Sequence, residues 1–98
     1  MAIRGFSDKA TEDIANRRNS KESRRKLPQE LHDKAWVKLT RLNAAPSLSS
    51  LVSMAGNKLE KLKGDRLGQY SIRINDKYRI CFKWEGNNPA NVEIVDYH

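Results

Sequence analysis

The sequence has few of the residues that build metal sites and reactive centres. Its 98 residues include one cysteine, Cys81, and two histidines, His32 and His98. A lone cysteine forms no disulfide within the chain, which is typical of a reducing compartment. One cysteine and two distant histidines do not supply a zinc ligand set, so we predict no metal and no cofactor. Cys81 alternates with Ile80 and Phe82, which indicates a small residue inside a sheet.

Long apolar runs and glycine-rich phosphate loops are also missing. No stretch approaches the ~20 apolar residues that cross a bilayer, and residues 1–6 lack the apolar segment of a signal peptide. We therefore expect a cytoplasmic protein without a membrane partner. A chain of 98 residues has room for one domain, 1–98, and not for two.

Positive charge is what the sequence has in excess. The chain has 19 Lys and Arg against 12 Asp and Glu, a formal net charge of +7 at pH 7. Such a surplus on a small domain favours a polyanionic partner and electrostatically steered association. The charge is concentrated in residues 17–26 and 58–83.

The first of these clusters lies in a segment with little to bury. Between residues 11 and 26, Ile14 is the only large apolar residue, so little burial offsets the ordering entropy. We expect 11–26 to be partly disordered until another surface covers it. Whether its basic part, 17–26, contacts a partner or is simply solvated stays open.

Two helices are expected before the sheet. The longer one has Pro28 near its first turn and ends at residues 43–46, because proline disfavours a helical conformation in the residue before it. Its apolar residues recur at spacings of three or four; they are Leu27, Leu31, Ala35, Leu39 and Leu42. Ser47 can cap a shorter helix that contains Leu51 and Met54 and stops near residue 56.

Weaker signals complete the first half. Residues 3–6 indicate a short strand, and Ser7 or Asp8 can cap the helical pattern that follows. His32 stands among polar residues and is read as a solvated surface histidine. Trp36 is read as a core residue.

An antiparallel sheet is expected in the second half. Residues 70–75 and 78–84 alternate with period two and form a β-hairpin, and a loop at 85–89 leads to a last strand at 91–95. Because alternate residues face opposite ways, the hairpin has one apolar face and one that we term the basic face. The apolar face comprises Tyr70, Ile72, Ile74, Ile80, Phe82 and Trp84, and the basic face comprises Ser71, Arg73, Arg79 and Lys83. The expected fold is an α+β domain with two helices packed on one face of a small twisted antiparallel sheet.

Four blocks in the second half resemble one family. They are Leu-Lys-Gly-Asp-Arg (62–66), Gly-Gln-Tyr-Ser-Ile-Arg-Ile-Asn (68–75), Tyr-Arg-Ile-Cys-Phe-Lys-Trp (78–84) and Asp-Tyr-His (96–98). In this order they resemble the HigB branch of the RelE-like toxins, which belong to bacterial toxin–antitoxin systems. The similarity covers 59–98 well and the first half in outline. It implies the RelE-like microbial RNase fold.

The resemblance also implies an activity, partners and a site. The implied activity is metal-independent, ribosome-dependent endoribonuclease cleavage of mRNA, which inhibits translation and growth. The implied partners are the ribosome, mRNA and a HigA-like helix-turn-helix antitoxin, with operator DNA contacted indirectly through the antitoxin. The active-site positions of related toxins are all occupied here, by Lys63, Arg79, Asp96, Tyr97 and His98.

These residue types suit RNA cleavage without a metal. The reaction needs a deprotonated 2′-hydroxyl, a stabilised phosphorane-like charge and a proton for the leaving 5′-oxygen. Arg79 offers a planar fork of donors to phosphate, and Lys63 offers a compact charge. His98 has an imidazole that titrates near neutrality, Tyr97 can stack on a base or donate its hydroxyl, and Asp96 can orient a neighbour or act as a base. Which group is the acid and which the base stays open.

Other cations have competing interpretations. The residues read as phosphate-binding are Lys61, Arg66, Arg73 and Lys83. Arg66 can equally pair with Asp65, Lys63 can be a charged turn residue, and Arg79 can be a solvated strand residue. Because both are taken as surface residues, we expect replacement of Lys63 or Arg79 to change folding stability little.

One position departs from the family pattern. Some relatives carry a histidine three residues before the active-site lysine, where this chain has Glu60. A carboxylate there repels phosphate, yet it can also serve as a base. The alternative function is a non-enzymatic basic protein that binds ribosomal RNA or an antitoxin and acts by occupancy.

Overall fold

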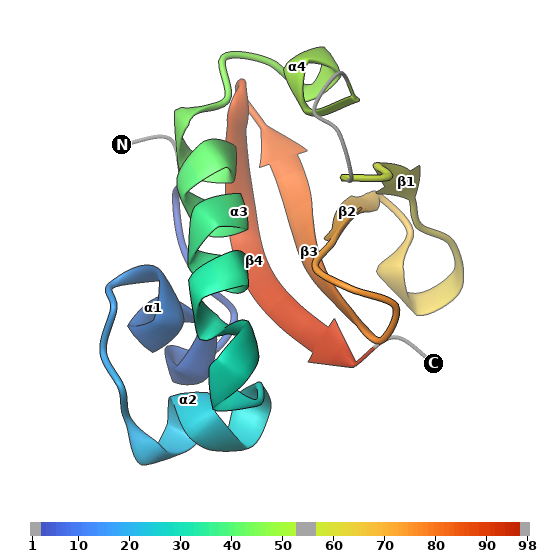
Figure 1. Cartoon of the computed structure of the whole chain (residues 1–98). Coiled ribbons are helices and arrows are strands. Elements are labelled where there is room, and N and C mark those ends of the chain that lie inside the picture. Colours follow the sequence, from blue (N-terminus) through green and yellow to red (C-terminus); the bar gives the residue numbers. More distant parts are fainter. Residues whose placement is uncertain (1–2, 53–56, 97–98) are drawn as a thin grey trace.

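The computed structural model describes residues 3–52 and 57–96. Helices in the first half precede a four-stranded antiparallel sheet of order β1-β2-β3-β4 (Figure 1). The strands are β1 (Glu60–Lys61), β2 (Gln69–Arg73), β3 (Tyr78–Glu85) and β4 (Asn88–Asp96). This arrangement has the predicted α+β class. Within the two described ranges, no helix has the length and apolar character needed to cross a membrane.

Strands β2 and β3 form the predicted hairpin. Ile72 pairs with Ile80, and Arg73 pairs with Arg79. At the turn, the side-chain oxygen of Asn75 accepts hydrogen bonds from backbone N–H groups two and three residues on, which is a common way for asparagine to close a turn. The apolar face is confirmed: Ile72, Ile74, Ile80 and Phe82 are buried, with Tyr70 and Trp84 packed against the core.

Strand β4 is longer than predicted. Gly86 and Asn87 have φ values of 54° and 67°, the left-handed conformation that a tight hairpin turn requires. The predicted loop at 85–89 is therefore mostly strand, with Pro89 opposite Trp84. Proline is tolerated there because β4 is an edge strand. In place of the predicted strand over 3–6, an isolated parallel bridge joins Phe6 to Val92 of β4.

Helix α3 (His32–Ala44) covers the apolar face (Figure 1). Its buried residues Ala35, Leu39 and Leu42 recur at the predicted spacings. The helix is preceded by a 3₁₀ turn, η1 (Gln29–Leu31), which follows Pro28. Leu27 is fully buried as well. Its backbone is extended and it directly follows the helix of residues 21–26, so it belongs to the core and not to α3.

The shorter predicted helix is α4 (Leu48–Val52). Ser47 stands directly before it, and its Oγ accepts the N–H of Ser50 at 3.3 Å. Leu51 is fully buried and anchors the helix to the core. Met54, which we assigned to the same helix, lies outside the described residues.

The predicted number of helices, two, was too low. The described residues contain four α-helices, because α1 (Lys9–Ala15) and α2 (Lys21–Lys26) precede α3. Asp8 caps α1 by accepting the N–H of Thr11 at 2.6 Å. Ser20 and Ser23 form a capping box at the start of α2. Much of the segment 11–26, which we expected to be partly disordered, is therefore helical.

Buried polar contacts hold this segment in place of the missing apolar residues. Thr11 is fully buried, and its Oγ1 accepts the backbone N–H of Ile94 at 3.0 Å. Asp13 is 1% exposed and accepts the hydroxyl of Ser20 at 2.7 Å. That hydrogen bond holds the pKa of the Asp13 carboxyl below its ordinary value. These contacts lead us to expect an ordered segment, which backbone relaxation would measure.

We expect Thr11→Val to lower the free energy of unfolding by about 1 to 3 kcal/mol. Valine has nearly the same shape, but it leaves the buried N–H of Ile94 without its acceptor. Urea unfolding gives the value. Thr40→Val at an exposed position of α3 is the matched control and should change stability by less than about 0.5 kcal/mol. Equal effects of the two substitutions would contradict a stabilising role for this contact.

Candidate active site

Arg79 lies at the centre of the candidate site and is buried. It belongs to the basic face, as predicted, yet it is only 7% exposed. Its Nε donates to Ser71 Oγ at 2.7 Å, its Nη2 donates to the Lys58 carbonyl, and its Nη1 lies 3.1 Å from Glu60 Oε1. The interpretation of Arg79 as a solvated strand residue is therefore wrong. Its guanidinium joins β1 and Lys58, two residues before that strand, to Ser71 of β2.

Strand β1 explains this burial. Glu60 pairs with Ser71 and Lys61 with Tyr70, so a two-residue strand extends the sheet beside β2. Glu60 shares the side of Ser71, and its side chain is 53% exposed. Lys61 alternates to the side of Tyr70, which is the apolar side of the hairpin. The structure thus places Lys61 and Arg79 on opposite sides of the sheet, and Lys61 is not among the cations of the basic face.

Lys63 stands at the start of the loop between β1 and β2. The loop contains the 3₁₀ turn η2 (Gly64–Arg66), and both Gly64 and Gly68 have positive φ, 63° and 91°. Glycine favours this left-handed conformation because it has no Cβ. Lys63 itself is exposed. The Lys-Gly-Asp block therefore places the ammonium group of Lys63 two residues after β1, the strand whose Glu60 pairs with Arg79.

Arg66 belongs to the same loop and is tied to the sheet. Its Nη2 lies 3.2 Å from Glu93 Oε1 on β4, and its Nη1 donates to Gln69 Oε1 at 3.1 Å. The side chains of Arg66 and Glu93 are 36% and 26% exposed. The predicted pairing of Arg66 with Asp65 is not observed, because its carboxylate partner is Glu93, and phosphate binding by Arg66 stays a prediction.

Arg73 and Lys83 share the basic face with Arg79. Arg73 lies opposite Arg79 in the register of β2 and β3, and its guanidinium pairs with Asp76. Lys83 lies further along β3, opposite Gln69, and is half-buried. The structure therefore brings three of the predicted cations to one face of two adjacent strands.

Asp96 is not on that face. It is opposite Tyr78 at the end of β4 and shares the side of that buried tyrosine. Its carboxylate lies 3.7 Å from Lys77 Nζ. Tyr97 and His98, the other predicted residues of this block, lie outside the described residues.

Cys81 lies in the row that crosses the sheet from Ser71 to Glu93. It is fully buried, and burial raises the pKa of its thiol. This confirms its interpretation as a packing residue of the sheet. Across residues 3–52 and 57–96, His, Cys, Asp and Glu side chains do not gather in groups of three that could hold a metal ion.

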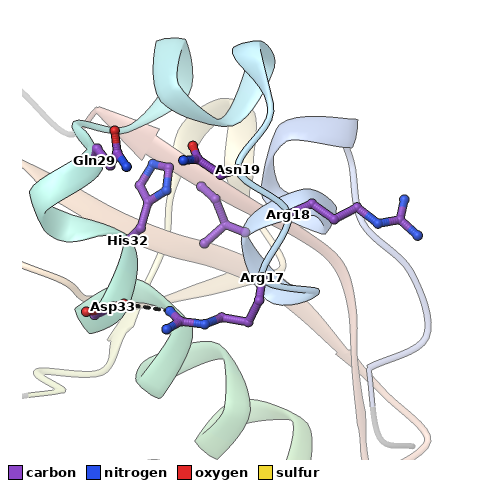
Figure 2. Close-up of a pocket in the computed structure, with 7 residues that line it drawn as sticks. Arg17, Arg18, Asn19, Gln29, His32 and Asp33 are labelled. Carbon is purple, nitrogen blue, oxygen red and sulfur yellow. Dashed lines mark hydrogen bonds and ion pairs between the residues drawn. The ribbon is translucent and has the colours of Figure 1, made fainter.

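A hollow of about 320 Å³ lies among the helices of the first half, and Arg79 is not among the residues that line it (Figure 2). Its polar lining comes from the α1–α2 connection and from the start of α3 and comprises Arg17, Arg18, Asn19, Gln29, His32 and Asp33. Arg17 pairs with Asp33 at 2.7 Å and lies 4.9 Å above the ring of Trp36, whereas Arg18 points away from the hollow. Trp36 is half-buried under this arginine and lies outside the core that we predicted for it.

His32 is also placed differently from the prediction. It is half-buried, and its Nε2 lies 2.8 Å from the Leu27 carbonyl and 3.1 Å from the Ser23 carbonyl. Since both neighbours are acceptors, Nε2 carries the proton and donates to them. His32 therefore closes the carboxyl end of α2 and is not a solvated surface histidine.

Comparison with known proteins establishes the family. The sequence profile of RelE-like toxins of the type II toxin–antitoxin system HigB matches residues 6–98. This chain belongs to that family. Among the relatives of this HigB-like toxin, Toxin HigB-1 of Vibrio cholerae serotype O1 is 38% identical over 60 residues, which are 61% of this chain and 63% of that toxin. The chain thus aligns with somewhat less than two thirds of that relative.

Solved structures of similar fold include YoeB proteins. The Staphylococcus aureus YoeB–YefM complex matches with a TM-score of 0.60 and 25% identity, covering 98% of this chain and 94% of that one. The Staphylococcus aureus YoeB dimer matches with a TM-score of 0.61 and 24% identity, covering 100% and 97%. These similarities show that the fold of this chain resembles that of the YoeB structures.

Proposed function

We propose that this HigB-like toxin is a cytoplasmic endoribonuclease that cleaves mRNA on the ribosome and is neutralised by a HigA-like antitoxin. The observation that carries the proposal is a buried arginine held on the basic face, with a half-exposed carboxylate beside it and an exposed lysine on the adjoining loop. The net charge of +7 supports an RNA partner. A type II toxin also needs an antitoxin, and the complex of YoeB with YefM is an example of such a pairing.

The arrangement around Arg79 suggests how a phosphate is received. The planar guanidinium presents its Nη1 donors toward the oxygens of a phosphorane, and prior fixation of its Nε and Nη2 by Ser71 and the Lys58 carbonyl reduces reorganisation during the reaction. Glu60 holds the outer nitrogen until substrate arrives. A bound phosphate replaces this carboxylate on Nη1, which releases Glu60 to accept the proton of the 2′-hydroxyl. Lys63 adds a second cation at the scissile phosphate.

Glu60→Gln is expected to slow cleavage by about 10²- to 10⁴-fold, the usual range for loss of a general base. The pair with Arg79 is half exposed on the Glu60 side, so folding stability should change by no more than about 1 kcal/mol. Single-turnover cleavage on programmed ribosomes measures the rate. The exposed residue Glu30 supplies the matched control, Glu30→Gln, which should cleave normally. A Glu60→Gln rate equal to or above that of the unmodified protein would show that Glu60 only screens Arg79.

Removal of Tyr97 and His98 tests the enzymatic proposal against action by occupancy. In an enzyme that uses these two groups, a chain ending at Asp96 should lose toxicity and cleavage while it still binds ribosomes. In a protein that acts by occupancy, the truncated chain should remain toxic, whereas Arg73→Glu on the basic face should abolish both binding and toxicity. Sedimentation with ribosomes and growth after induction distinguish the two results.

A further inference from the structure

The loop that carries Lys63 has little packing of its own. Leu67 near its end is 74% exposed, and the backbone hydrogen bonds of Arg66 and Leu67 go to Lys63 and Gly64, within the same loop. Where the loop joins β1 and β2, the N–H of Leu62 donates to the Gln69 carbonyl. Exposed backbone with few buried contacts is the part of a fold that opens most readily. A side-chain contact that fixes this loop to the sheet, which we term a tether, therefore contributes more to the order of the backbone than such a contact does in the strands.

The contacts of Arg66 supply such a tether. Its guanidinium spans from Gln69 at the start of β2 to Glu93 on β4, with contacts of 3.1 and 3.2 Å. Glu93 also lies 3.8 Å from Lys26 Nζ of α2. The carboxylate thus stands on the sheet, opposite the fully buried Cys81.

We propose that Glu93 is a positioning residue that fixes the Lys63 loop through Arg66. The part that concerns cleavage rests on the proposed function, in which Lys63 meets the scissile phosphate. A catalytic group has to be held close to its productive position, and a loose support lowers the rate even when the group itself is present. In this arrangement Arg66 holds the loop in place, and its guanidinium is already paired with Glu93 before RNA binds.

A direct phosphate-binding role of Arg66 makes the opposite prediction for one conservative substitution. If Arg66 bound RNA, Glu93 would compete with the phosphate, and Glu93→Gln would strengthen RNA binding and speed cleavage. If Glu93 positions the loop, Glu93→Gln keeps the shape of the side chain but weakens the tether, so the loop loosens and cleavage slows. The sign of the change separates the two roles.

The experiment compares the unmodified protein with Glu93→Gln and with Lys26→Gln as the matched control. Lys26→Gln removes the other cation beside Glu93 and leaves the Arg66 contact intact. We expect backbone order parameters of residues 63–68 to fall in Glu93→Gln from about 0.85 to below about 0.6, and to stay near the first value in Lys26→Gln. Cleavage on programmed ribosomes should show a kcat lower by on the order of tenfold for Glu93→Gln, with KM nearly unchanged.

The exchange Arg66→Glu with Glu93→Arg should restore the order of the loop, because it rebuilds the ion pair in the reverse direction. A loop that is equally ordered in Glu93→Gln and in the unmodified protein would overturn the tether, and so would faster cleavage or tighter ribosome binding by that variant. The order parameters are measured on the free protein. A result in which the loop loosens but even the unmodified protein cleaves nothing would therefore reject the proposed function and leave the tether supported.

Discussion

Arg79→Ala is expected to abolish cleavage and, at the same time, to destabilise the fold. Loss of one preorganised donor to a developing negative charge commonly lowers kcat by about 10²- to 10³-fold. The same substitution removes the donors of Ser71 Oγ and the Lys58 carbonyl, and hydrogen bonds from a charged donor contribute about 1.5 to 3 kcal/mol each. We expect a loss of about 2 to 3 kcal/mol in urea unfolding. The arginine therefore has two roles that a growth assay alone would confuse.

Ser71→Ala separates these roles. It removes the acceptor of the Arg79 Nε at 2.7 Å and keeps the guanidinium in place through the Lys58 carbonyl and Glu60. We expect a loss of stability of about 1 kcal/mol with cleavage largely retained. Rates for both variants are taken at a temperature at which circular dichroism shows each to be folded. A folded Arg79→Ala protein that still cleaves at the rate of Ser71→Ala would contradict the assignment of Arg79.

Cleavage of naked mRNA is expected to be slower, by at least about 10³-fold, than cleavage of the same message during translation. Arg79 is held by hydrogen bonds and an ion pair, and Asp96 lies on the other side of the sheet. Within 3–52 and 57–96 the carboxylate that pairs with Arg79 is Glu60, and two other carboxylates near these cations, Asp76 and Glu93, pair with Arg73 and Arg66. Effective molarities of about 10⁵ M or more show how much a positioned substrate can supply.

The measurement uses one message, either free or bound in the A site of purified ribosomes, with equal toxin. Lys63→Ala serves to detect contaminating ribonuclease, since residual cleavage by that variant on free RNA would come from another enzyme. Its exposed position predicts a change in stability of less than about 0.5 kcal/mol. Similar rates on free and translated mRNA, with an inactive Lys63→Ala control, would show that the protein alone is the complete catalyst.

The alternation of residues predicts the faces of the hairpin but not their burial. Period two in 70–75 and 78–84 correctly places Ile80 on the core side and Arg79 on the other. Whether the second face is solvated depends on what packs over it. Here the Lys58 carbonyl and the Glu60 side chain contact Arg79, and β1, which lies beside β2, has two residues, too few to show any period. The prediction that Arg79 is a surface residue was wrong because this strand was not predicted from the sequence.

Composition likewise missed the anchors of the first two helices. Counting apolar residues finds Ile14 and little else, because Thr11 and Asp13 are residue types that usually lie on the surface. In the fold, Thr11 accepts a backbone hydrogen of β4, a partner more than eighty positions away in the chain. The partner of Arg66 is also distant in sequence: Glu93 lies 27 positions on, within β4, so the adjacent Asp65 was the natural guess.

Mapping the 5′ ends of cellular mRNA after brief induction tests the central claim most directly. The protein with its native sequence should create new 5′ ends inside translated reading frames within minutes. Lys63→Ala, induced to the same protein level, should create none, because its fold is intact and its cation at the scissile phosphate is missing. Growth arrest by the unmodified protein with no new 5′ ends would contradict the account and would favour a basic protein that acts on the ribosome by occupancy.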